Sequence, residues 1–88
     1  MKKFIIGVLH KDGKFLVERR HEHEKFFPGS VQFPGGAIDP GETDEVALKR
    51  EMKEELDIEP IAYKFLQEHS YPDGRNGRVY LIDKYAGA

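Results

Sequence analysis

The amino-acid sequence predicts an α+β fold in which one helix packs against a β-sheet. Residues 4–9 are apolar on both alternating faces, which is typical of a strand in the middle of a sheet. Residues 43–56 contain no Gly or Pro and are rich in helix-forming side chains, so they indicate a helix. Residues 61–71 and 78–85 are rich in aromatic and branched side chains, and the turn-forming segment between them indicates a hairpin.

Length and composition exclude several classes of protein. A chain of 88 residues forms one domain at most. Because it has no cysteine, it has no disulfide framework, thiolate zinc site or cysteine nucleophile. Its 14 Lys and Arg against 16 Asp and Glu give a net charge of −2, so we expect no nucleic-acid polymer as a partner. No apolar run approaches the roughly 18 residues of a membrane span, and we expect a cytoplasmic protein.

Local signals divide the first half of the chain. Asp12-Gly13 tolerates positive φ at both turn centres, which predicts a hairpin between residues 4–9 and a second strand that begins at Phe15. Residues 19–30 show neither the helical nor the strand periodicity of apolar side chains, so they predict a loop of about a dozen residues. Loops of this length are uncommon unless they have a function. A short extended piece at 31–33 leads into two clusters of Gly and Pro. The helix follows, with Glu42 or Thr43 near its N-cap.

Three carboxylates form one stripe on the predicted helix. At about 100° per residue, Glu51, Glu54 and Glu55 fall within about 100° of one another, beside the apolar face of Leu48 and Met52. Like charges at these spacings cost an isolated helix only about 0.2–0.5 kcal/mol per pair. A solvated acidic face therefore explains the stripe as well as a divalent-cation site of hard oxygen ligands does.

The residues before the helix favour the metal site. Gly35-Gly36 lies between the extended piece and the helix, where the absence of a Cβ lets a ligand or metal approach the backbone. The sequence also resembles the Nudix box, G-x5-E-x7-R-E-U-x-E-E-x-G-U, in which U is aliphatic. The matching positions are Gly36, Glu42, Arg50, Glu51, Met52, Glu54, Glu55 and Ile58. Residues 31–36 and 41–43 look like the surroundings of this box in MutT-type nucleoside triphosphate pyrophosphohydrolases.

The chain departs from the family pattern in two places. The final Gly of the box is Asp57, at a point where the helix should end in a left-handed residue, which Asp adopts with some strain. Nudix domains also continue with another strand, an acidic loop and a helix. The resemblance therefore implies a single incomplete domain over residues 1–88, a Nudix-type α/β/α sandwich with a mixed sheet that lacks the usual C-terminal strand and helix.

The resemblance also implies a metal-dependent enzyme. Nudix enzymes cleave a nucleoside diphosphate linked to another group, by attack of a metal-activated water on phosphorus. The implied ligands of Mg²⁺ or Mn²⁺ are the Gly36 carbonyl and the carboxylates of Glu51, Glu54 and Glu55. One of these glutamates would take the proton of the attacking water. Arg50 would orient the carboxylates.

Candidates for substrate binding lie outside the helix. Arg19 and Arg20 end the second predicted strand, where the similar MutT segment contributes to the nucleotide pocket; a solvated strand end explains them equally well. Phe33, in the flank that matches the family, is a third candidate. Arg75 and Arg78 are predicted to lie in a solvated turn rather than at phosphates.

The preferred function is Mg²⁺-dependent hydrolysis of a nucleoside triphosphate to the monophosphate and pyrophosphate, with oxidised purines first by resemblance. Two alternatives stay open: a catalytically weak or silent nucleotide-binding module, and a fragment completed by a partner chain or a second copy. The short C-terminus predicts that one face of the sheet lacks its cover, which favours a homo-oligomer. The side chains expected on that face include Phe65, Tyr80 or Ile82. A nucleotide is the expected partner, and a membrane is not.

Overall fold

The computed structural model describes residues 3–15, 18–19 and 31–87. Its elements are β1 (Lys3–Lys11), β2 (Lys14–Phe15), β3 (Glu18–Arg19), β4 (Val31–Gln32), β5 (Gly35–Ala37), α1 (Asp44–Leu56), β6 (Ile58–Ser70) and β7 (Asn76–Gly87). The predicted loop at residues 20–30 and the continuation of the second strand at 16–17 lie outside the described residues.

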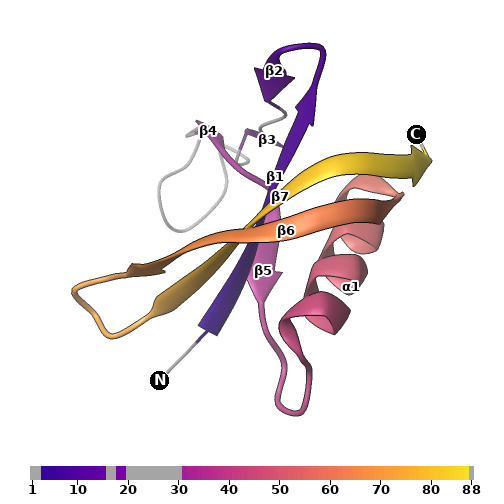
Figure 1. Cartoon of the computed structure of the whole chain (residues 1–88). Coiled ribbons are helices and arrows are strands. Elements are labelled where there is room, and N and C mark those ends of the chain that lie inside the picture. Colours follow the sequence, from indigo (N-terminus) through magenta and orange to yellow (C-terminus); the bar gives the residue numbers. More distant parts are fainter. Residues whose placement is uncertain (1–2, 16–17, 20–30, 88) are drawn as a thin grey trace.

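The main sheet is mixed, as the sequence predicts. Its strand order is β2-β1-β7-β6, and β5 also pairs with β1. β1 runs parallel to β7 and antiparallel to β2 and β5, and β6 and β7 form an antiparallel hairpin. β1 therefore lies in the middle of the sheet, and Figure 1 shows α1 beside it. The turn between β1 and β2 has positive φ at Asp12 (52°) and Gly13 (76°), which confirms the predicted hairpin.

Both ends of α1 are capped by the residues that the sequence indicates. Thr43 is the N-cap, and its side-chain oxygen accepts a hydrogen bond from the Val46 N–H at 3.2 Å. Asp57 ends the helix in the left-handed region, with φ 55° and ψ 41°, and its N–H bonds to the Lys53 carbonyl. No helix of the described residues is long and apolar enough to cross a membrane.

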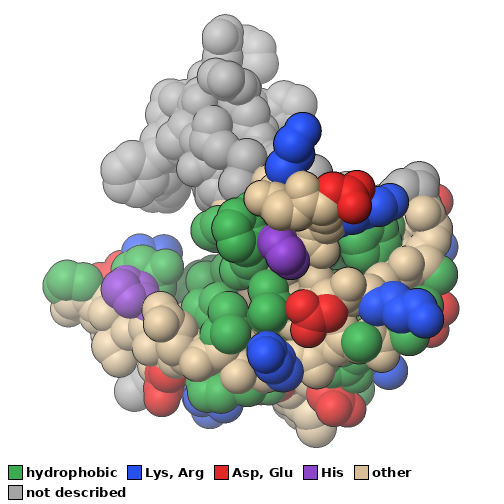
Figure 2. All heavy atoms as spheres, turned by 45° about the horizontal axis from the view of Figure 1, so that its top comes forward, with side chains coloured by type: hydrophobic (Ala, Val, Ile, Leu, Met, Phe, Trp, Pro, Cys, Tyr) green, Lys and Arg blue, Asp and Glu red, His purple; other side chains and the backbone are tan. Residues whose placement is uncertain are grey.

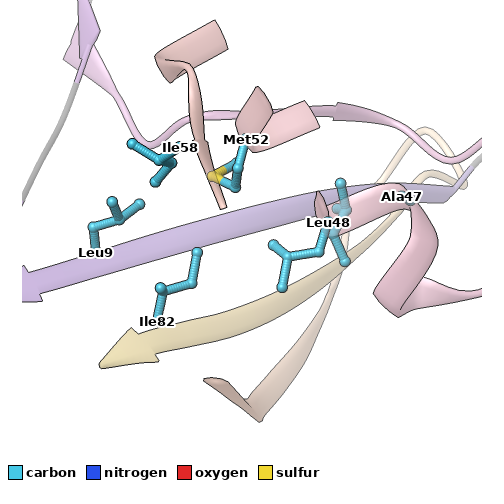
Figure 3. Close-up of a cluster of buried hydrophobic side chains, with 7 residues drawn as sticks. Leu9, Ala47, Leu48, Met52, Ile58 and Ile82 are labelled. Atoms are coloured by element: carbon cyan, nitrogen blue, oxygen red, sulfur yellow. The ribbon is translucent and has the colours of Figure 1, made fainter. Parts of the chain in front are cut away.

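The core lies between α1 and the face of the sheet that carries Ile5 and Leu9. Figure 3 shows how side chains from the helix, β1, β6 and β7 meet there. The fully or almost fully buried members are Ile5, Leu9, Ala47, Leu48, Met52, Ile58 and Ile82. Because side chains alternate along a strand, Phe4 and Ile6 of β1 point to the opposite face of the sheet.

Two predictions about the second hairpin are wrong. β6 begins at Ile58 rather than 61, and Pro60 lies within it; β6 is an edge strand of the sheet, where the missing N–H of proline is tolerated. Ile82 was expected on an uncovered face, but it is 0% exposed because its side chain packs under α1. Tyr80 also packs against that core, whereas Phe65 is 44% exposed.

Large apolar side chains do remain at the surface. Figure 2 shows hydrophobic side chains gathered in the middle of one face of the molecule. The most exposed are Phe15, Phe33, Val46, Ile61, Phe65 and Leu66. They come from β2, the segment before β5, α1 and β6, so among the described residues the exposed apolar side chains are not confined to the hairpin of β6 and β7.

The left-handed residue at the end of α1 gives a first prediction. Asp57→Gly and Asp57→Ala both remove the exposed ion pair with Lys53, so a comparison of the two isolates the backbone conformation. We expect the glycine variant to be more stable by about 1 kcal/mol, because a Cβ atom in the left-handed region costs roughly that amount. Urea unfolding followed by circular dichroism measures the difference, and equal stability of the two variants would contradict it.

Candidate active site

Two consecutive glycines let β5 lie very close to its neighbours. Gly35 pairs with Ile6 of β1, and Gly36 pairs with Ile5. A Cβ atom on Gly35 would collide with the carbonyl oxygen of Ile5, and one on Gly36 would lie 2.6 Å from the carboxylate of Glu51. Since neither position has room for a side chain, the glycine pair is what allows β5 to fit between β1 and the helix.

Two carboxylates of α1 meet this glycine pair. Glu51 is only 8% exposed, and its carboxylate lies directly against Gly36. One turn later, Glu55 Oε2 accepts a hydrogen bond from the Gly35 N–H at 3.0 Å. The carboxylate stripe of the helix therefore faces the backbone of β5.

Arg50 holds the carboxylates around this segment. Its Nε and one Nη donate to the two carboxylate oxygens of Glu42 at 2.7 and 2.8 Å, a paired contact of the kind that suits guanidinium geometry. The other Nη donates to Glu51 Oε1 at 2.8 Å and to Glu54 Oε2 at 3.4 Å. Arg50 also donates to the Ala37 carbonyl at 3.0 Å, so it ties the helix to the end of β5.

This arrangement shifts two pKa values strongly. The hydrogen bonds from Arg50, together with one from the Asp39 N–H, lower the pKa of Glu42 to about 2. The same contact with Glu42 raises the pKa of Arg50 above its usual range. Both groups therefore stay charged across the neutral range, and Arg50 remains a fixed cation beside the carboxylates.

The third carboxylate is the more exposed one. The Glu54 side chain is 58% exposed, and its Oε2 lies 3.4 Å from the Arg50 Nη atom that also donates to Glu51. Within residues 3–15, 18–19 and 31–87, no three His, Cys, Asp or Glu side chains are gathered closely enough to hold a metal ion.

A cavity of about 420 Å³ opens beside the glycine pair. It is lined by Phe4, Ile5, Ile6, Phe33, Gly35, Gly36, Tyr71 and Arg75. Since Phe4 and Ile6 point away from α1, the cavity lies on the opposite face of the sheet from the core. The glycine pair is common to the cavity and to the carboxylate cluster, whereas no glutamate of α1 is among the residues that line the cavity.

One wall of the cavity combines aromatic rings with a cation. The Arg75 guanidinium lies over the ring of Tyr71 at 4.7 Å and over that of Phe4 at 5.6 Å. Its Nε donates to Asp73 Oδ2 at 2.7 Å, which fixes the guanidinium at the turn between β6 and β7. Flat rings and a fixed cation suit a ligand that carries both a planar base and negative charge.

The structure brings together most of the site residues that the sequence suggests. Gly36, Arg50, Glu51, Glu54 and Glu55 form one cluster, and Phe33 lines the cavity. Arg19 lies in β3, which pairs with β4 in a separate two-stranded sheet. Arg20 lies outside the described residues.

Sequence reasoning missed the contribution of the second hairpin. Arg78 was assigned to a solvated turn, but it lies in β7 and bonds to Asp44 at the start of the helix. Arg75 is in the turn as expected, and its side chain is 45% exposed, yet it lines the cavity with Tyr71. An arginine four residues from the nearest aromatic residue in the sequence gives no local signal of such a role, because the wall forms only when the hairpin pairs with β1.

In the described residues, a mixed sheet packs against α1, and the acidic stripe of α1 meets a glycine pair, as the resemblance to the Nudix class implies. The NUDIX domain family matches residues 2–85, so the chain belongs to the Nudix family. The nucleoside triphosphatase NudI of Salmonella agona is similar to it, with 32% identity over 92% of this chain. The alignment covers 63% of that relative, so the chain spans less than two thirds of its length.

Solved structures share the fold. The MutT Nudix hydrolase from Burkholderia pseudomallei has a TM-score of 0.89 and 26% identity, over 98% of this chain and 69% of that one. A MutT structure from work on Aliivibrio salmonicida and Vibrio cholerae has a TM-score of 0.85 and 23% identity, over 98% of this chain and 68% of that one. The matched part of this chain therefore has the architecture of a Nudix domain and corresponds to about two thirds of each of those structures.

The close fit between Gly36 and Glu51 gives a second prediction. Gly36→Ala places a methyl group where the Glu51 carboxylate now lies. We expect this change to destabilise the protein by about 1–3 kcal/mol, as overpacking does in other well-packed sites. In the background Glu51→Ala the same change should cost much less, because the colliding carboxylate is gone. Urea unfolding of the wild type, the two single variants and the double variant measures these losses in unfolding free energy. If the losses of the single variants simply add in the double variant, the contact is contradicted.

The depressed pKa of Glu42 gives a third prediction. Because the pKa of Glu42 is about 2 in the folded protein and near 4.5 when unperturbed, its pairing stabilises the fold fully above about pH 5 and progressively less toward pH 2. Glu42→Gln should therefore flatten the fall in unfolding free energy between pH 5 and 2. Glu45→Gln, which removes an exposed carboxylate of the first helical turn, should retain the wild-type slope. If the unfolding free energy falls equally steeply between pH 5 and 2 in all three proteins, the prediction is wrong.

Proposed function

We propose that the chain hydrolyses a nucleoside triphosphate to the monophosphate and pyrophosphate with the help of a divalent metal ion. The observation that carries the proposal is the nearly buried carboxylate of Glu51, seated against Gly36, which also lines a cavity of about 420 Å³. The similarity to the nucleoside triphosphatase NudI of Salmonella agona supports this substrate class. More specifically, we propose oxidised purine nucleotides as the substrates, because the sequence resembles MutT-type enzymes.

The residues present fit Mg²⁺ or Mn²⁺. Glu51, Glu54, Glu55 and the Gly36 carbonyl offer hard oxygen donors, which suit these ions. Gly36 leaves room for a carboxylate against the backbone, which a Cβ atom would fill. A bound divalent ion would supply an activated water and neutralise charge on the phosphates.

The chain's own side chains accept a proton, orient the carboxylates and bind the nucleotide. One of the three glutamates accepts the proton of the attacking water, and the oxygen of that water forms a bond to phosphorus while the bond to pyrophosphate breaks. Arg50 orients Glu51 and Glu54, which it contacts directly. In the cavity, Phe33 and Tyr71 offer rings for the base, and Arg75 offers a positive charge for the phosphates.

A catalytically silent nucleotide-binding module is the second candidate. It is favoured by the exposure of Glu54 and by the observation that no three acidic or histidine side chains of the described residues are gathered closely enough to hold a metal ion. This candidate retains the cavity but assigns the carboxylates to charge compensation with Arg50. Turnover measurements separate it from the enzyme.

The deciding experiment is a substrate panel with and without Mg²⁺. It compares nucleoside triphosphates, including oxidised purines, with dinucleoside polyphosphates and nucleotide sugars, and it identifies the released products. Pyrophosphate release from a triphosphate that depends on the metal supports the proposal. Binding of the same nucleotides without any turnover supports the silent module.

A fourth prediction concerns Glu51. If its carboxylate holds the metal or takes the proton of water, Glu51→Gln should lower turnover about 10²- to 10⁴-fold, the usual effect of losing a general base. Glu45→Gln is the matched control, because it removes an exposed carboxylate from the same helix away from β5. Equal turnover in wild type and Glu51→Gln would contradict the assignment.

Two other expectations have no observation that tests them. Self-association and a cytoplasmic location stay predictions of the sequence. Sedimentation over a concentration series addresses the first of them.

A further inference from the structure

Asp44, the first residue of α1, is fixed to strand β7. Its Oδ2 atom accepts hydrogen bonds from Arg78 Nε at 2.9 Å and from the Tyr80 hydroxyl at 2.8 Å. The side chains of Asp44 and Arg78 are only 23% and 28% exposed, so the ion pair is partly shielded from water. Burial alone would raise the pKa of Asp44, but the two hydrogen bonds lower it, and the carboxylate stays charged.

The partners on the sheet are themselves held in place. The Arg78 guanidinium lies 4.5 Å from the centre of the Phe65 ring, and its Nη1 is 3.7 Å from Glu68 Oε2. The Tyr80 ring packs edge-on against Phe65, with centroids 5.5 Å apart. Asp44 therefore binds to a preorganised pair of donors rather than to flexible surface side chains.

Asp44 is in line with two of the site carboxylates. Glu51 and Glu55 follow it by seven and eleven residues, which at about 100° per residue places both within about 20° of Asp44 around the helix axis. Along the axis they lie about 10 and 16 Å away. The line begins at β7 and ends at β5, with β1 between these two strands. A rotation of α1 about its axis would move all three residues together.

The other contacts of the helix restrain this rotation differently. Leu48 and Met52 are buried, and apolar packing resists separation of helix and sheet without specifying a direction. The contacts of Arg50 with Glu51 and Glu54, and that of Glu55 with Gly35, use the carboxylates that a metal would bind. These contacts must change when a metal binds. The contacts of Asp44, like those of Arg50 with Glu42 and the Ala37 carbonyl, need not.

We propose that Asp44, Arg78 and Tyr80 are positioning residues that set the rotation of α1, and through it the fit of Glu51 and Glu55 to the glycine pair. The inference rests on the proposed function, because that function makes these carboxylates the metal ligands. It adds three residues outside the carboxylate cluster that control metal affinity without touching the metal or the substrate.

The test compares Asp44→Asn and Arg78→Gln with the matched control Glu45→Gln. Glu45 is the other acid in the first turn, so its variant loses the same favourable charge at the helix N-terminus without touching β7. Mn²⁺ affinity is measured by electron paramagnetic resonance, and amide exchange at Gly35 is followed by NMR without metal. We expect Asp44→Asn to weaken Mn²⁺ binding about tenfold, the lower end of the effect of losing a supporting contact at a metal site.

The Gly35 N–H should exchange faster in Asp44→Asn than in the control, because its hydrogen bond to Glu55 depends on the rotation of the helix. The double variant Asp44→Asn/Arg78→Gln should have the same Mn²⁺ affinity as the single variant that binds Mn²⁺ more weakly, because both changes remove the same contact. Tyr80→Phe, which keeps the ring and removes one hydrogen bond, is the milder change if the others fold poorly.

A purely structural role predicts another pattern. The unfolding midpoint would fall in the Asp44 and Arg78 variants, but the folded fraction would keep wild-type Mn²⁺ affinity and Gly35 exchange, which overturns the inference while the proposed function stands. A wild-type protein that binds no Mn²⁺ at Glu51 would overturn the metal site of the proposed function and this inference together.

Discussion

The close approach of α1 to strand β5 is the constraint on which the rest of the site depends. It brings the Glu51 carboxylate against the backbone of Gly36 and leaves it 8% exposed. A carboxylate at that depth loses much of its hydration and requires a compensating charge. Arg50 supplies that charge, and its remaining donors are used by Glu42 and by the Ala37 carbonyl. The ion-pair network is therefore a consequence of the glycine pair, and not an independent feature of the surface.

The parts of the fold that short stretches of sequence determine could be predicted. Asp12-Gly13 specifies its turn through two positive φ angles, and Thr43 specifies the start of the helix through one hydrogen bond. Asp57 occupies the left-handed position at the helix end, as its place in the box indicates. The carboxylate stripe followed from helical geometry. In each case the deciding interactions span only a few residues, so a local pattern contains them.

The features of the fold that could not be predicted from the sequence depend on pairing between distant segments. Arg78 contacts Asp44 across 34 residues, and no local sequence pattern near either residue indicates this contact. Ile82 is buried because β7 lies beside β1 in parallel, with Leu9 opposite Ile82, which brings its side chain under the helix. The register between β6 and β7 also shifts at three places, so alternation along β6 does not say which side chains reach the core. Sequence periodicity cannot supply these registers.

The architecture separates the carboxylates from most of the cavity. Glu51, Glu54 and Glu55 belong to one helix on one face of the sheet, whereas Phe4, Phe33, Tyr71 and Arg75 come from β1, the segment before β5 and the turn after β6. The glycine pair is the structural element common to both. Changes in the turn can therefore alter the shape and charge of the cavity without moving the helix, because the helix is held by its core contacts and by Asp44. In such an arrangement the choice of substrate can vary while the carboxylate cluster is preserved, which is how one fold comes to serve several substrates.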